Sequence, residues 1–207
     1  MEYLSLFGMI LVIHLLAVMS PGPDFVMVLK NALQYDKKTA IYTSLGISMG
    51  IAVHILYSVG GVAYLLQHNT KVFAIVKIMG AIYIMYIGWK TLRTPLKKID
   101  ITTAKSLQKL SPKAAFKIGF LTNVLNPKAS LFFLSLFSLV IPQNTPFWTL
   151  IVISLMLIGV TFLWFTLVSY IFTSKTTVTI YEQYEPVLLK VFGIVLILLG
   201  IAIFFEI

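Results

Sequence analysis

Long apolar runs constrain what this chain can fold into more than any other feature of its sequence. Each run is about twenty residues long, the length that a helix needs to cross the hydrocarbon core of a membrane. Only helices or closed barrels satisfy the backbone in lipid, and runs of this length predict helices. Because 59% of the residues are hydrophobic and 11% are charged, we expect a single all-α integral membrane domain over residues 1–207. The six expected spans are 4–29, 40–66, 72–92, 116–141, 147–172 and 187–205.

Basic residues indicate how these spans are oriented. The first span begins with Glu2 and lacks a basic leader, so we expect it to be retained rather than cleaved. Basic residues collect on the cytoplasmic side of membrane proteins. The second connection holds only Lys71 and the fourth holds none. The first, third and fifth connections and their flanks hold Lys30, Lys37, Lys38, Lys90, Arg93, Lys97, Lys98, Lys105, Lys109, Lys113, Lys117, Lys175 and Lys190. This predicts cytoplasmic odd-numbered connections and both termini outside.

The net charge of +9 therefore reflects topology and contact with lipid headgroups rather than nucleic acid. The alternative is that the basic connection, residues 94–115, binds an anionic partner. The chain has no cysteine, so its redox compartment cannot be read from the sequence.

The two halves of the chain resemble each other. The third span opens with KIMG at 77–80, and the sixth contains KVFG at 190–193. The first span is interrupted by SPGPD at 20–24, and the fourth by LNPK at 125–128. Three spans per copy is an odd number, so the second copy enters the membrane from the opposite side. This predicts two inverted repeats, 1–93 and 116–207, which is a common build of secondary transporters.

The two interruptions predict broken helices and a site between the repeats. Proline removes a backbone donor and displaces a carbonyl, while glycine lets the backbone swing. We therefore expect Pro21, Gly22 and Pro23 to break the first span and Pro127 to break the fourth. Backbone groups freed in lipid need protein, water or a ligand as partners, so the breaks are candidate binding elements.

Charged residues accompany both breaks. Asp24 is the one acid well inside an apolar run, and an intramembrane carboxylate is a candidate cation or proton site. Its alternative role is a cap for the helix after Pro23. Lys128 is the natural partner of Asp24 or of a substrate carboxylate; its alternative is to extend its stem toward the membrane surface.

Other polar residues within the spans are weaker candidates. His54 is placed to relay a proton, or alternatively to bond a neighbouring carbonyl. Asn123 and Asn126 can bond a substrate or freed backbone. His14 is expected only to pack. Gly46 and Gly50 predict close helix packing, within the subunit or at a dimer contact.

No familiar enzyme or cofactor motif occurs. The sequence has no metal-ligand spacing, nucleotide-binding loop or nucleophile motif. We therefore expect no cofactor, no metal site and no enzymatic activity, and an ion or substrate gradient as the energy source.

The motifs resemble those of the lysine exporter/homoserine–threonine resistance (LysE/RhtB) superfamily. SPGPDF at 20–25 with LKNAL at 29–33 is similar to its first-span signature, and FKIGFLTNVLNPKA at 116–129 to its fourth. TSLGISMG at 43–50 and GAIYIMYIGWK at 80–90 resemble its second and third spans. The resemblance implies export of amino acids or close derivatives across a bacterial inner membrane, by exchange with protons.

We expect the substrate to bind near the two breaks, between Asp24 and Lys128. A metal-cation exporter of a related branch is the nearest alternative, although it would need a second intramembrane acid. An intramembrane enzyme would need a nucleophile–base set, and an assembly subunit would not need two broken helices. A homodimer is left open.

Overall fold

All the secondary-structure elements in the described part of the chain are α-helices. The computed structural model describes residues 2–94, 110–140, 145–172 and 175–205. The helices are α1 (Glu2–Met19), α2 (Pro23–Gln34), α3 (Lys37–His68), α4 (Thr70–Leu92), α5 (Pro112–Val124), α6 (Pro127–Val140), α7 (Phe147–Ile171) and α8 (Lys175–Phe205). Lys97, Lys98, Lys105 and Lys109, within the expected basic connection, lie outside the described residues.

Both predicted breaks are present. The first expected span is divided into α1 and α2, which meet at an angle of 57°. The fourth is divided into α5 and α6. Each second half begins with a proline, Pro23 or Pro127. Proline is tolerated there because the first N–H groups of a helix have no intrahelical partner. The sequence therefore ends one helix and starts another at the same point.

Four described helices are long and apolar enough to cross a membrane, or five if α1 and α2 form one bent span. The α5–α6 pair falls outside that count, so the expected number of six is not reached. The reason is local: α5 carries Lys113 and Lys117, and the break leaves α6 short, with an apolar segment of only Pro127–Leu139. The last helix differs too, since α8 begins at Lys175 and runs through Pro186 before the expected span 187–205.

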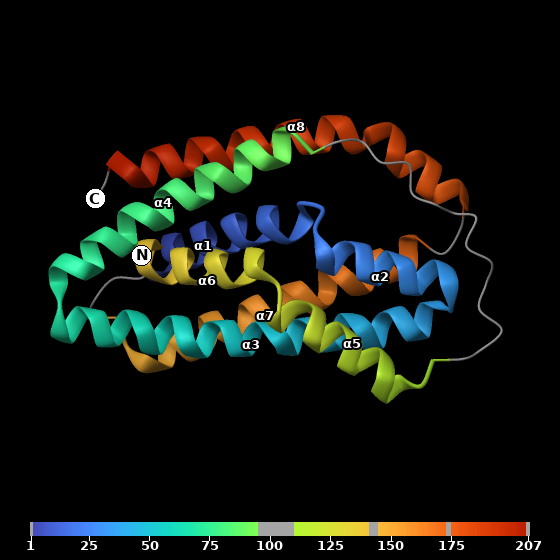
Figure 1. Cartoon of the computed structure of the whole chain (residues 1–207), viewed down its shortest axis with the longest axis horizontal. Coiled ribbons are helices and arrows are strands. Elements are labelled where there is room, and N and C mark those ends of the chain that lie inside the picture. Colours follow the sequence, from blue (N-terminus) through green and yellow to red (C-terminus); the bar gives the residue numbers. More distant parts are fainter. Residues whose placement is uncertain (1, 95–109, 141–144, 173–174, 206–207) are drawn as a thin grey trace.

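The helices lie alongside one another in opposing directions (Figure 1). The α1–α2 pair runs from one end of the molecule to the other, and α5–α6 runs back. The two breaks lie near each other at mid-length. The start of α1, the end of α8 and the α3–α4 connection lie at one end, while the α2–α3 connection and the start of α5 lie at the opposite end. The fold thus places two interruptions in the interior of the bundle.

Close backbone packing joins α3 to α5. A Cβ on Gly46 would collide with the backbone oxygen of Phe116, and one on Gly119 with that of Thr43. A Cβ on Gly50 would lie 2.7 Å from Oδ1 of Asn123. Small residues at helix contacts allow such approach in membranes, where packing rather than water exclusion holds helices together. Gly46 and Gly50 therefore act inside the subunit, which decides between the two roles predicted for them.

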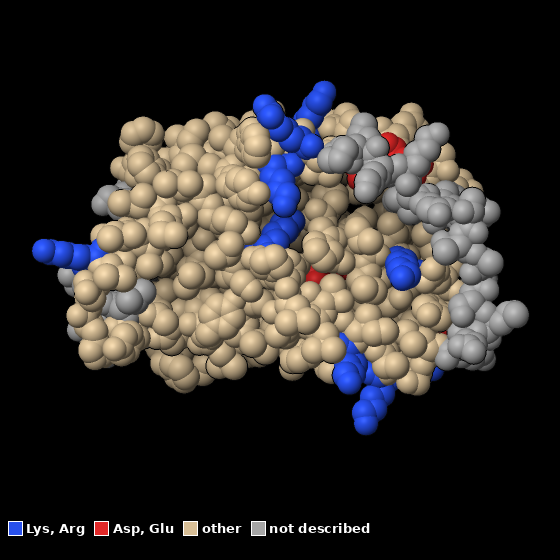
Figure 2. Space-filling view, viewed as in Figure 1, with Lys and Arg blue, Asp and Glu red and all other residues tan. Residues whose placement is uncertain are grey.

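Large apolar side chains face outward over much of the molecule. Leu56, Leu155, Leu163 and Leu198 are all more exposed than buried. On the face shown in Figure 2, wide areas carry no charged side chain, and basic side chains form a line from the upper edge toward the middle. Such an apolar exterior fits contact with lipid tails. The core beneath it is apolar as well, with Ile10, Ile13, Leu136 and Phe137 at most 1% exposed.

Candidate functional site

The two helix breaks form the centre of the candidate site. At the first, Gly22 is the N-cap of α2 in an extended conformation and makes no side-chain cap bond. At the second, the Asn126 side chain accepts a hydrogen bond from the Lys128 backbone N–H at 3.0 Å. Asn126 thereby caps α6. Each new helix then carries a charged residue directly after its first proline, Asp24 in α2 and Lys128 in α6.

Each charged residue reaches across to the other break. Oδ2 of Asp24 accepts hydrogen bonds from the side-chain amides of Asn123 at 3.0 Å and Asn126 at 3.1 Å. Nζ of Lys128 donates to the backbone oxygens of Ala17 at 3.3 Å and Ser20 at 3.0 Å. We call these four hydrogen bonds the crossed contacts. They tie residues about a hundred positions apart in sequence into one polar centre.

The crossed contacts bear on two predictions. Of the two partners expected for Lys128, Asp24 makes no hydrogen bond with its ammonium, which donates to carbonyl oxygens at the end of α1, and the substrate carboxylate stays a prediction. A cation is stabilised there because the last carbonyls of a helix carry partial negative charge. The alternative role of Asp24 as an N-cap is wrong, since Gly22 occupies that position.

His54 lies behind the site rather than on its wall. Its Nε2 is 2.9 Å from the backbone oxygen of Asn123, so Nε2 carries the hydrogen. Its Nδ1 is 2.8 Å from the Tyr57 hydroxyl, and the ring stacks on Phe133 with centroids 5.9 Å apart. The carbonyl-bonded alternative is therefore present, and it fixes the backbone from which Asn123 reaches Asp24.

An inner cavity of about 50 Å³ lies beside the crossed contacts. Its wall includes Asp24, Asn123, Asn126 and Lys128, together with aromatic side chains of α2, α6 and α7. A buried water needs roughly 10–15 Å³ of such space, so a few waters fit and a whole amino acid does not.

Two side-chain oxygens of the residues that line this cavity are buried and unpaired within the described structure. They are Oδ1 of Asp24 and Oδ1 of Asn123. A buried acceptor without a partner costs about 1–3 kcal/mol. The Asn123 amide nitrogen faces the Asp24 carboxyl group, so the Asn123 oxygen has no donor among the described residues. The site can therefore accept further hydrogen bonds from a donor such as an ammonium group.

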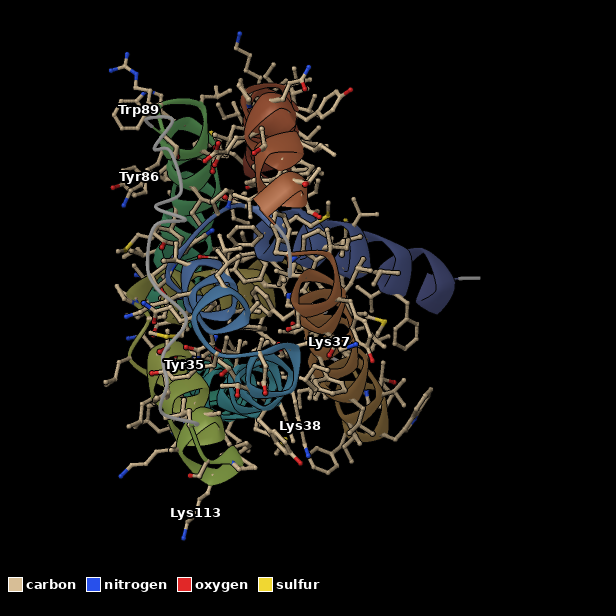
Figure 3. The ribbon with its side chains drawn as sticks, turned by 90° about the vertical axis from the view of Figure 1, so that its right-hand side faces the viewer. Tyr35, Lys37, Lys38, Tyr86, Trp89 and Lys113 are labelled. Carbon is tan, nitrogen blue, oxygen red and sulfur yellow. The ribbon has the colours of Figure 1, made fainter. Side chains whose placement is uncertain are left out.

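A larger outer cavity of about 600 Å³ adjoins the inner one. The two cavities share Ser20, Gly22, Asn126 and Lys128 in their walls. The outer cavity is also bordered by Pro21, Pro23 and Pro127, by α4 residues that include Tyr86, Trp89 and Lys90, and by Arg93, the C-cap of α4. Figure 3 shows Tyr86 and Trp89 projecting from the same side of α4. The predicted site residues other than His54 therefore line one or both cavities.

The sequence analysis missed part of this wall. His14 and Thr161 line the inner cavity, although His14 was expected only to pack. Ser20 bonds Thr91 at 3.0 Å beside the first break. The sequence did offer one indication that His14 could line a site: an ionisable residue inside a membrane span is by default a functional candidate. Thr161 carried no such signal, since threonine is common at helix contacts in membranes.

No group of three or more His, Cys, Asp or Glu that could hold a metal ion occurs among the described residues. The one carboxylate at the breaks has two amide partners, and amide N–H groups donate rather than coordinate a cation. The arrangement is better suited to an organic ion that brings its own donors and acceptors.

Comparison with known proteins gives a consistent set of relatives. A family model described as LysE type translocator matches residues 15–206. The threonine efflux protein of Escherichia coli (strain K12) is 32% identical over 170 residues, which are 82% of each chain. An uncharacterized membrane protein of Haemophilus influenzae is 27% identical over 199 residues, 95% of each chain. The uncharacterized membrane protein YrhP of Bacillus subtilis is 28% identical over 191 residues, 89% of this chain and 91% of that one. No solved structure matches the chain.

Proposed function

Because this chain belongs to the LysE type translocator family, we propose that it is a secondary transporter that exports small amino acids from the bacterial cytoplasm. Family membership supports a multi-pass transporter of the inner membrane rather than an enzyme. The relative named as a threonine efflux protein supports amino-acid export and suggests a small substrate.

The crossed contacts are the observation that carries this proposal. A free amino acid has an ammonium group and a carboxylate on neighbouring carbons. In the proposed complex the ammonium meets Asp24 and the unpaired oxygen of Asn123. The carboxylate meets Nζ of Lys128, which gives up its bonds to the α1 carbonyls. Charge-assisted hydrogen bonds of this kind are stronger than neutral ones.

The inverted repeat is proposed as the basis of alternating access. Pro23–Asp24 in the first half and Pro127–Lys128 in the second occupy corresponding places in their broken helices. The last helices of the two halves, α4 and α8, also pack closely: a Cβ on Gly88 would lie 2.7 Å from the Gly193 oxygen, and one on Gly193 would lie 2.8 Å from the Gly88 oxygen. In this proposal residues 1–93 and 116–207 form two three-span halves that rock against each other around the site.

The crossed contacts also suggest how binding drives the motion. They join the two halves directly, since Asp24 and Lys128 belong to different halves and each bonds the other half. A substrate that takes over these partners would loosen one set of links between the halves. Differential binding of this kind is what shifts a conformational equilibrium.

We place the outer cavity on the cytoplasmic route, with both termini outside. Lys37, Lys38 and Lys113 lie toward the end of the molecule that faces the viewer in Figure 3, as expected for a cytoplasmic side. The outer cavity is large enough for an amino acid and contains Lys90 and Arg93. Protons entering from outside through Asp24 or His54 would drive amino-acid export.

The test is transport by the purified chain in proteoliposomes. A panel of labelled amino acids, including threonine, serine, leucine and lysine, is measured with and without an imposed proton gradient. We expect gradient-dependent movement of one or a few small amino acids. Folded protein that moves none of them, or that moves a divalent cation from a parallel metal panel, would contradict the proposal.

A further inference from the structure

A buried histidine and a buried threonine line the inner cavity, and the proposed function gives neither of them a role. His14 in α1 is completely buried, and Thr161 in α7 is 1% exposed. Nε2 of His14 lies 2.8 Å from Oγ1 of Thr161. Both residues line the cavity whose wall also holds Asp24 and Lys128.

Helix packing accounts for only part of this pair. His14 contacts the Leu157 backbone as well as Thr161 on α7, but its Nδ1 is buried without a hydrogen-bond partner in the described structure. The ring lies among Phe132 and Phe133, with centroid distances of 6.0 and 5.7 Å, and aromatic rings do not satisfy an imidazole nitrogen. An unpaired buried polar atom is costly in lipid as in a protein core. A leucine or phenylalanine would pack at this place without that cost.

We propose that His14 and Thr161 form a specificity subsite that binds a hydroxyl group on the side chain of the transported amino acid. The inference rests on the proposed function, and it deepens it by naming the substrate class. With the ammonium at Asp24 and the carboxylate at Lys128, the side chain is the substrate group left to meet the remaining polar residues of the cavity wall.

A hydroxyl is the group that suits this subsite. It both donates and accepts, so it can pair with Nδ1 of His14 whether that nitrogen carries a hydrogen or not. A methyl group of the same size pairs in neither case. The subsite therefore selects hydroxylated amino acids over their aliphatic counterparts.

The experiment compares threonine with valine, and serine with alanine, in the same proteoliposomes. Each pair differs in one hydroxyl, and the ratio of rates cancels the amount of active protein. We expect the wild-type chain to move threonine at least about tenfold faster than valine, because losing a hydrogen bond to a buried polar group has an effect of this order. Thr161→Val and His14→Phe should each bring that ratio close to one, while Thr161→Ser should keep it.

Thr149→Val is the matched control. Thr149 lies on the same helix, is also completely buried and has an unpaired hydroxyl in the described structure, but it does not line the inner cavity. This variant should leave the threonine-to-valine ratio unchanged.

The outcomes separate this inference from the proposed function. A wild-type chain that transports amino acids but moves valine as fast as threonine overturns the subsite and leaves the exporter intact. Thr161→Val or His14→Phe with an unchanged ratio overturns it as well. A wild-type chain that transports no amino acid removes the proposed function itself. If a variant fails to insert, the wild-type ratio and the other variant still decide.

Discussion

At the scale of single residues, the site depends on one acid and one base in corresponding positions. Each follows the proline that starts the second half of a broken helix, and each is held by the other break. Asp24 keeps one oxygen unpaired, whereas the Lys128 ammonium has two carbonyl partners. The acid is thus already available to a ligand, while the base must exchange partners to bind one.

Replacing Asp24 with Asn is expected to abolish export or reduce it by roughly tenfold to hundredfold, since hydrogen bonds to a charged group contribute about 1.5–3 kcal/mol. The amide still accepts from Asn123 and Asn126, so the fold should persist. Efflux of labelled amino acid from proteoliposomes, with monodispersity in detergent as the folding check, measures this. Correctly inserted Asp24→Asn protein that exports at the wild-type rate would remove Asp24 from the site.

Lys128→Met and Lys128→Arg test the base. Methionine fills a similar volume without charge and leaves the oxygens of Ala17 and Ser20 without their donor, so we expect loss of transport and a lower unfolding temperature. Arginine keeps the charge, and we expect it to retain the unfolding temperature and part of the transport rate. Equal transport by the Met and Arg variants would show that the charge of Lys128 has no part in binding.

At this scale the residues that meet at the two breaks could be predicted from the sequence, but their hydrogen-bond partners could not. Asp24, Asn123, Asn126 and Lys128 were predictable from residue type, because charge and amide groups are rare in lipid. The crossed contacts were not, since the choice between a side-chain and a backbone partner depends on how α1 ends near α6. The place of His14 on the cavity wall could not be predicted either, because it depends on how α1 packs against α6 and α7.

At the scale of elements, the helix breaks could be predicted from the sequence, whereas the partners in the helix contacts could not. Proline and glycine act locally, so both breaks were predicted where they occur. The start of α8 at Lys175 was not, because polar residues of that segment, such as Glu182 and Glu185, read as a connection. Gly46 and Gly50 predicted a close helix contact, but the sequence did not indicate that α5 is the partner helix.

Gly46→Ala should destabilise the protein more than Gly60→Ala, although both glycines lie in α3. A Cβ at residue 46 collides with the Phe116 backbone, which cannot move without separating α3 from α5, whereas nothing lies within 4 Å of one at residue 60. Alanine is the better helix former by about 1 kcal/mol, so the second variant should be neutral or more stable. Thermal unfolding in detergent gives the comparison, and equal unfolding temperatures would mean that the α3–α5 contact is looser than described.

At the scale of the whole molecule, the arrangement of the ends follows the pattern of basic residues. The start of α1 and the end of α8 share one end of the bundle with the α3–α4 connection, and the α2–α3 connection and the start of α5 lie at the other (Figure 1). Hydropathy alone does not recover this path, because the α5–α6 pair is too polar and too divided to be counted as a span. The position of the bilayer along the bundle therefore has to be measured.

The absence of cysteine in the chain makes that measurement direct. Single cysteines at Lys38, Lys113 and His68, all exposed residues, can be labelled in intact cells with a membrane-impermeant maleimide. We expect labelling at residue 68 alone, because the other two lie at the end predicted to face the cytoplasm. Labelling at residue 38 or 113 instead would reverse the orientation of the molecule.

The pairing of one acid with one base also has an electrical consequence. With Asp24 ionised and Lys128 protonated, the site is neutral when empty, and a zwitterionic amino acid leaves it neutral when occupied. Carrying such a substrate across a membrane moves no net charge, so the potential exerts no force on that step. Any current that accompanies export then belongs to the coupling ion, at about 2.3 kcal/mol per charge for each 100 mV. The voltage dependence of the export rate would therefore give the number of coupled ions per transported amino acid.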